Sequence, residues 1–310
     1  MEISECKLSS SSPSLHGDIE IISVDADRSS INEHEARSRC RTKQLRYQYP
    51  MKFWVPRGSH TSSSCLWLYG MQFGGGFVGG DDVHCRITVG NRCRCLYTSL
   101  GYGKAFSCEG QQEIKQNWQY IVDENALLIV MPDPIMVYAD AVFMQKQEVI
   151  LSDASSEIIL LDWYTAGRAT LREHWSAKRI ASDTAVTKNG KPIFHDAFRL
   201  EHRSHGGQIL PAAMGKYTVF GTCVIIGSQL SSMLQGKLEQ LKMGYAYGVT
   251  PDCTAIATTS LLYEDIQDTA QIGHVVRFCF YSTIQAYEFL GDLLDPIFSL
   301  SGGNPFERHY

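Results

Sequence analysis

Two carboxylates stand out by where they fall in the sequence. Asp81 closes the run 74–82, which has five glycines in its first seven positions, and Asp162 follows the apolar run that starts at residue 157. A buried carboxylate is costly unless it is paired or functional, so each is a candidate cation ligand. The structural alternatives are a crowded turn for Asp81, with Asp82 as a solvated neighbour, and an ion pair with a cation such as Arg168 for Asp162.

Imidazoles and thiols offer weaker metal-site signals. His202 and His205 are three residues apart and could share a metal on a helix, but the glycines at 206 and 207 favour a loop. Cys93 and Cys95 would lie on one face of a strand, whereas structural zinc sites need three or four ligands with loop spacing. The sequence contains neither Gly-x-Ser-x-Gly nor His-Glu-x-x-His, so residue chemistry gives no support for an enzyme.

The glycine-rich run predicts a special backbone rather than a nucleotide loop. A phosphate-binding loop opens a helix, and a Rossmann loop follows a strand and precedes a helix. Here a strand-like segment follows, and the run ends in acids that would repel phosphate. So many glycines indicate positive φ angles, or another part of the backbone too close for a Cβ.

Composition limits the class of protein. The 310 residues carry a net charge of −5, so no overall basic field favours nucleic acid. The N-terminus lacks the basic and apolar segments of a secretory signal, and no apolar run is long enough for a bilayer, so we expect a cytoplasmic protein. The ten cysteines are then expected to be reduced thiols.

Strand signals dominate from residue 47 onward. Apolar residues alternate with polar ones over 83–89 and 114–122. Residues 126–131 are apolar throughout and 157–163 are mostly apolar, as in strands covered on both faces. Asn189-Gly190 predicts a hairpin. Helical spacing appears only at about 228–243 and 282–294, the second ended by Asp295-Pro296.

These patterns predict a mostly β fold. We expect a β-helix or β-sandwich-like scaffold of many short strands with two α-helices in the C-terminal third. The Ser-rich and charged residues 1–45 are predicted to be a disordered polar tail, and 46–310 a single domain.

Several segments, in order from about residue 46 to 300, together resemble the urease accessory protein D (UreD) family in its eukaryotic form. The first is the family signature Gly-Gly-x-x-Gly-Gly-Asp, found at 75–81. The others lie at 97–106, 127–134, 162–168 and 190–196. The signature residues are Gly75, Gly76, Gly79, Gly80, Gly167 and Arg168. Two departures are Pro134, where many bacterial members carry glutamate, and Thr98-Ser99 in place of a Thr-Thr pair.

The resemblance implies a non-catalytic chaperone for urease maturation. It implies binding to apo-urease together with UreF and the GTPase UreG, with GTP bound by that partner and no tightly bound cofactor in this chain. Nickel would pass through the protein, and Asp81 and Asp162 match acids implicated in that passage. Such a conduit must bind weakly enough for the ion to leave, which suits isolated carboxylates and water.

Two alternatives remain open from the residues. One is a β-helical protein that binds or hydrolyses carbohydrate, using Asp81, Asp162 and the neighbouring Trp163 in an exposed groove. The other is an interaction scaffold with no metal role. Acids in an open cleft beside exposed aromatic rings would favour the carbohydrate function, and acids lining an internal channel would favour nickel transfer.

Overall fold

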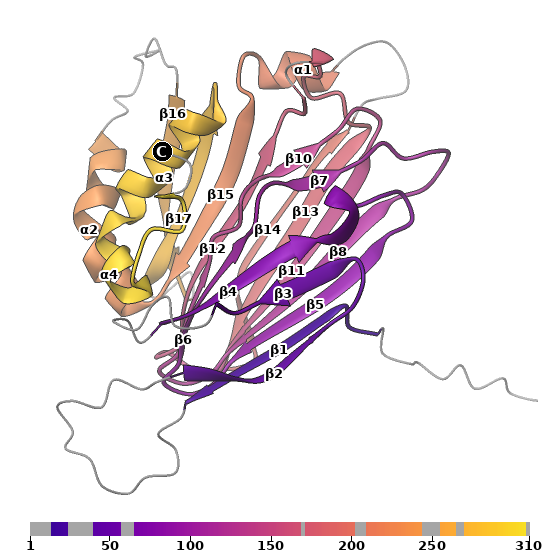
Figure 1. Cartoon of the computed structure of the whole chain (residues 1–310). Coiled ribbons are helices and arrows are strands. Elements are labelled where there is room, and N and C mark those ends of the chain that lie inside the picture. Colours follow the sequence, from indigo (N-terminus) through magenta and orange to yellow (C-terminus); the bar gives the residue numbers. More distant parts are fainter. Residues whose placement is uncertain are drawn as a thin grey trace, which may run out of the picture.

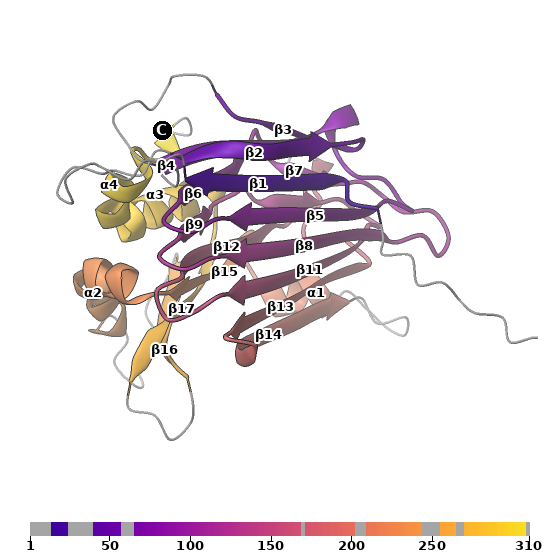
Figure 2. The ribbon, with the colours of Figure 1, turned by 90° about the horizontal axis from the view of Figure 1, so that it is seen from below.

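Two β-sheets face each other and form the body of the protein (Figures 1 and 2). The computed structural model describes residues 14–23, 40–56, 65–168, 171–201, 209–243, 255–264 and 270–307. Sheet A contains, in spatial order, β14 (Lys191–Glu201), β13 (Arg179–Lys188), β11 (Val142–Leu151), β8 (Ile114–Val122), β5 (Asp82–Val89), β1 (Gly17–Ser23) and β2 (Cys40–Tyr47).

Sheet B is the larger of the two. Its main path contains, in spatial order, β16 (Ala255–Tyr263), β17 (Gln271–Phe280), β15 (Val219–Ile226), β12 (Glu157–Thr165), β9 (Leu127–Val130), β6 (Arg94–Ser99), β4 (Cys65–Gln72) and β3 (Met51–Trp54). The short strands β7 (Gly103–Ala105) and β10 (Ile135–Val137) pair with each other beside this path.

The central chain winds as a solenoid between the sheets. From β4 to β13 it passes alternately to sheet B and sheet A, and each new strand pairs in parallel with the preceding strand of the same sheet. Parallel neighbours in this winding bring residues from successive coils into register. The glycine-rich run lies where the chain crosses from β4 in sheet B to β5 in sheet A.

Sheet B is buried on both faces, which explains its continuous apolar strands. On β9, Leu128 and Val130 face the core between the two sheets, whereas Leu127 and Ile129 face a second core. That second core lies beneath α2 (Ser228–Met243), α3 (Thr283–Leu294) and α4 (Phe298–Ser301), which gather on one side of sheet B (Figure 1).

The mostly β prediction is confirmed, including the hairpin at Asn189-Gly190 and both long helices. Ser282 caps α3 by accepting a hydrogen bond from the backbone N–H of Gln285. The short helices α1 (Ile209–Met214) and α4 were not predicted. No helix in the described ranges is long and apolar enough to cross a bilayer.

The predicted tail is wrong for two of its segments. Residues 17–23 form β1, which pairs with β2 and β5, and residues 40–45 belong to β2. The reason is that Ile19 and Ile21 alternate toward the core and are fully buried, which is enough apolar surface to hold a strand. The other tail residues, 1–13 and 24–39, lie outside the described ranges.

Removing a side chain from the second core should destabilise the whole protein. Leu290 of α3 is fully buried there, so Leu290→Ala is expected to lower the free energy of unfolding by about 2–5 kcal/mol. The matched control is the exposed Glu288→Ala on the same helix, expected to change it by less than about 0.5 kcal/mol. Urea denaturation measures both, and equal effects would contradict a helical layer that is part of the core.

Candidate functional site

The glycine-rich turn has both features that its sequence predicts. Gly74, Gly75 and Gly80 have positive φ angles of 72°, 81° and 96°. At Gly76, an added Cβ would lie 2.7 Å from the backbone oxygen of Lys104, so only glycine fits. The turn therefore depends on glycine for conformation and for close packing against the neighbouring coil.

Asp81 ends this turn and is held within it. Its Oδ2 accepts a hydrogen bond from the backbone N–H of Val78 at 2.9 Å, and its carbonyl accepts one from Lys115. Asp82 points elsewhere: its Oδ1 lies 3.0 Å from His84 Nε2 and 2.9 Å from Asn117 Nδ2. The turn is therefore connected to β8. Neither Asp81 nor Asp82 lines the cavity that reaches Asp162.

Asp162 lies in the interior, between the two sheets. It projects from β12 of sheet B and accepts hydrogen bonds from the opposite sheet, from Gln145 Nε2 at 2.9 Å and Ser182 Oγ at 2.7 Å. The predicted alternative, an ion pair with Arg168, is wrong. The Arg168 side chain bonds to Glu173 and stacks on the ring of Tyr138, because Gly167 has a φ of 105° and turns the chain away.

A cavity of about 220 Å³ reaches from the surface to Asp162. Its surface end lies where the strands of sheet B finish, beside the exposed Gly75, Leu100 and Gly101. Its inner end is lined by side chains of both sheets, including Trp118 and Asp162. We call this the interior cavity.

Polar side chains form one row across sheet A at the inner end of the interior cavity, whose lining includes Gln116 and Gln145 but not Ser182. Gln116 of β8, Gln145 of β11 and Ser182 of β13 are register partners on successive coils. The Oε1 of Gln116 is buried and has no hydrogen-bond partner, although it lines the cavity. Because buried polar atoms are nearly always satisfied, the natural partner is water or a ligand in the cavity. We call Gln116, Gln145, Gln147, Asp162 and Ser182 the polar lane.

Asp133 is a second carboxylate on the cavity, near its mouth, and the sequence analysis missed it. It is only 2% exposed, and its two oxygens accept hydrogen bonds from Tyr287 Oη and Gly101 N, each at 2.9 Å. Through these two hydrogen bonds, Asp133 connects the loop that contains Gly101, at the mouth of the cavity, to α3. Its sequence signal was slight: an acid between two prolines, next to the departure at Pro134.

The environment of Asp162 opposes its ionisation. Burial raises the pKa of its carboxyl to about 6, although the hydrogen bonds from Ser182 and Gln145 act in the opposite direction. At neutral pH the Asp162 carboxyl is therefore mostly ionised, although burial makes its anionic form unfavourable. Such a carboxylate gains from the arrival of a cation.

The other predicted metal candidates do not assemble. Among the described residues, no three His, Cys, Asp or Glu side chains gather closely enough to hold a metal ion. Cys93 and Cys95 are buried, and burial raises the pKa of the Cys95 thiol well above its ordinary value. A protonated thiol is a poor metal ligand. His202 and His205 lie outside the described residues.

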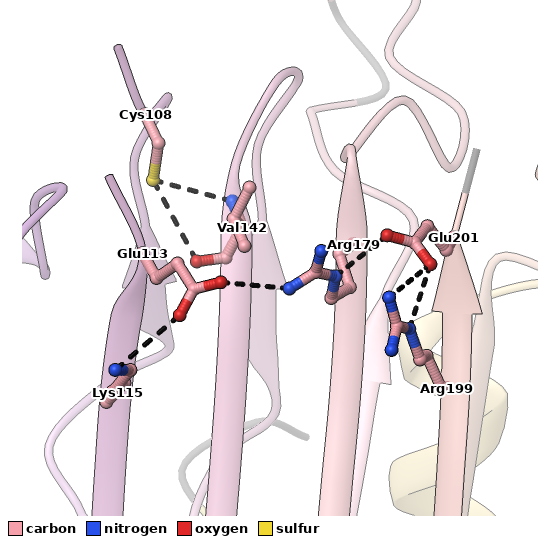
Figure 3. A network of polar contacts seen from close by, with 7 residues as sticks. All are labelled: Cys108, Glu113, Lys115, Val142, Arg179, Arg199 and Glu201. Carbon is pink, nitrogen blue, oxygen red and sulfur yellow. Dashed lines mark hydrogen bonds and ion pairs between the residues drawn. The ribbon is translucent and has the colours of Figure 1, made fainter. Parts of the chain in front are cut away.

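A chain of alternating charges crosses sheet A beside the glycine-rich turn (Figure 3). Glu113 joins this chain to the turn: its backbone oxygen accepts from Gly80, and its carboxylate contacts Arg179 at 2.9 Å. The charged residues, in spatial order, are Lys115, Glu113, Arg179, Glu201 and Arg199. Exposed pairs of this kind add little stability singly.

Comparison with known proteins gives the family. The family model described as "UreD urease accessory protein" matches residues 28–300. Urease accessory protein D of Arabidopsis thaliana is 28% identical over 275 residues, which are 84% of this chain and 92% of the relative. Urease accessory protein UreD of Sorangium cellulosum is 30% identical over 189 residues, 61% and 58% of the two chains. The chain belongs to the UreD family, whose named members are accessory proteins of urease.

Neutralising Asp162 should stabilise the fold most at high pH. The folded-state pKa, about 6, lies above the ordinary 3.8, so the ionised carboxyl destabilises the native state and the penalty grows between about pH 4 and 6. Asp162→Asn is expected to raise the free energy of unfolding at pH 7.5 by about 1–3 kcal/mol. The Ser182 hydroxyl can turn to accept from the new amide.

The measurement is urea denaturation at pH 7.5 and pH 4.5, with the exposed Glu288→Gln as control. The advantage of Asp162→Asn should shrink at the lower pH, whereas the control should show little difference at either. An advantage that stays constant or grows at low pH would mean that ionisation of Asp162 is not what destabilises the protein.

Proposed function

We propose that this protein conveys nickel ions to apo-urease through the interior cavity and past Asp162. The supporting observation is the polar lane: an ionisable carboxylate and three buried amides line a space between two otherwise apolar sheet faces, and a hydroxyl bonds to the carboxylate from behind that space. Family membership supports a role in urease maturation, and a cavity that reaches Asp162 supports a route for the metal through the interior.

The lane has suitable chemistry for transit. Amide and hydroxyl oxygens replace part of the water around a divalent cation, while thiolates and clustered imidazoles would hold nickel too firmly to release it. Asp133 at the mouth and Asp162 inside are two carboxylates along one cavity. Asp81 is proposed to act at the entrance, because it belongs to the same turn as Gly75, which lines the cavity.

We further propose that the protein works in an assembly with a UreF-like protein, a UreG-like GTPase and apo-urease in the cytoplasm. The mouth is bordered by exposed apolar groups, including Leu100 at 44% and Phe73 at 41% exposure. Such groups beside an opening suit a partner that seals it, so that an ion enters without meeting bulk solvent.

The geometry disfavours the carbohydrate alternative. Trp163, the ring proposed for sugar stacking, borders the interior cavity but is only 1% exposed and packs on Tyr287 of the helical layer. Asp162 lines an interior cavity, and Asp81 lies outside its lining. The two acids are therefore not paired across a groove.

Replacing either proposed carboxylate should lower nickel delivery. When urease is co-produced with its accessory proteins, Asp162→Ala and Asp81→Ala are each expected to reduce nickel per urease about tenfold, as for a loss of ~1.4 kcal/mol on the route. Asp82→Ala is the control, because Asp82 is a neighbouring acid that is 52% exposed and paired with His84.

Nickel is measured by elemental analysis of purified urease, and assembly by co-purification of the partners. Urease produced without this protein should be nearly free of nickel. Normal nickel content with both Asp variants would refute the route through these residues. Normal nickel content without the protein would refute the function itself.

A further inference from the structure

A second, smaller cavity lies on the other side of Asp162. It has a volume of about 10 Å³, room for about one water, and Asp162 lines both it and the interior cavity. Its polar walls include Ser182, Thr184, Asp196 and Thr222. We call it the edge cavity, because it lies toward β14, the last strand of sheet A.

Register explains why polar groups continue from Asp162 toward this edge. Across sheet B, Asp162 of β12 is paired with Thr222 of β15, which is paired with Arg277 of β17. Across sheet A, Gln147 of β11 is paired with Thr184 of β13, which is paired with Asp196 of β14. Two facing polar rows therefore run from the centre of the protein to the same edge.

The two rows meet in an ion pair. Arg277 Nη2 lies 3.1 Å from Asp196 Oδ1, so the pair spans the gap between β17 of sheet B and β14 of sheet A. The side chains are 49% and 32% exposed, whereas Thr184 and Ser182 behind them are buried. Exposed ion pairs are weak, so this contact can open without disrupting the fold.

We propose that the Arg277–Asp196 pair closes a second opening of the passage, at the edge between β14 and β17. In the closed state the guanidinium of Arg277 is paired with the carboxylate of Asp196. That carboxylate is the one that a cation would meet after Asp162. A cation crossing the edge displaces the guanidinium and takes its place on Asp196, and the pair re-forms behind it. This role of the edge rests on the proposed nickel function, while the closure itself does not.

Accessibility of a thiol placed in the edge cavity tests the closure without nickel or urease. Thr184→Cys puts a near-isosteric thiol on the cavity wall, in the tryptic peptide 180–188, which has no native cysteine. The full chain is treated with 2-aminoethyl methanethiosulfonate, a small cationic thiol reagent. Labelling of that peptide over time is followed by mass spectrometry.

Labelling should be slow with Arg277 present and about fivefold faster with Arg277→Met, equivalent to about 1 kcal/mol for an exposed pair. Asp196→Asn, which breaks the same pair from the other side, should give the same increase. Equal labelling rates with and without the pair would overturn the proposal, as would rapid labelling while the pair is intact.

The control is the other ion pair that joins the two sheets near this edge. Lys188 Nζ of β13 contacts Glu264 at 2.6 Å, and neither residue lines the interior cavity or the edge cavity. Glu264→Gln should leave the labelling rate unchanged, and an equal increase would mean that any loosening of the sheets exposes the thiol. If labelling follows the Arg277 prediction but urease made without this protein has normal nickel content, the closure stands and the nickel function fails.

Discussion

The central constraint is one carboxylate bonded across the core. Asp162 leaves sheet B and is held by Gln145 and Ser182 of sheet A, so a charge lies where the sandwich would otherwise be apolar. A buried carboxylate is tolerated there only if hydrogen-bond donors contact it and a polar cavity adjoins it. The cavities on either side of it satisfy this need, and they give the protein its candidate route.

The solenoid supplies the donors. Because successive coils of each sheet pair in parallel, one inward polar residue per coil becomes a continuous row. The helices cover the other face of sheet B and bury Trp163 there, which leaves the inner face free to host the row. The glycine-rich turn, packed against Lys104 of the next coil, helps to shape the mouth.

Much of the fold followed from the sequence, because alternation, double-sided apolar runs and the Asn-Gly hairpin are local signals. The polar lane did not, because strand register is set by pairing between distant segments. Gln116 did fall on the inward face of an alternating strand, and this was its visible signal. The wrong partner for Asp162 has a similar cause: Arg168 is near in sequence, whereas Gln145 and Ser182 reach Asp162 only because the two sheets face each other.

The most direct test of an interior route is nickel transfer in the presence of a chelator. Assembled, nickel-loaded accessory proteins and apo-urease are mixed with excess EDTA, and nickel retained by urease is counted. A route through the polar lane predicts that transfer survives EDTA with the wild-type chain and fails with Gln116→Trp, whose ring would fill the cavity. Transfer abolished by EDTA with the wild-type chain would contradict an interior route, because the ion would then have passed through solvent.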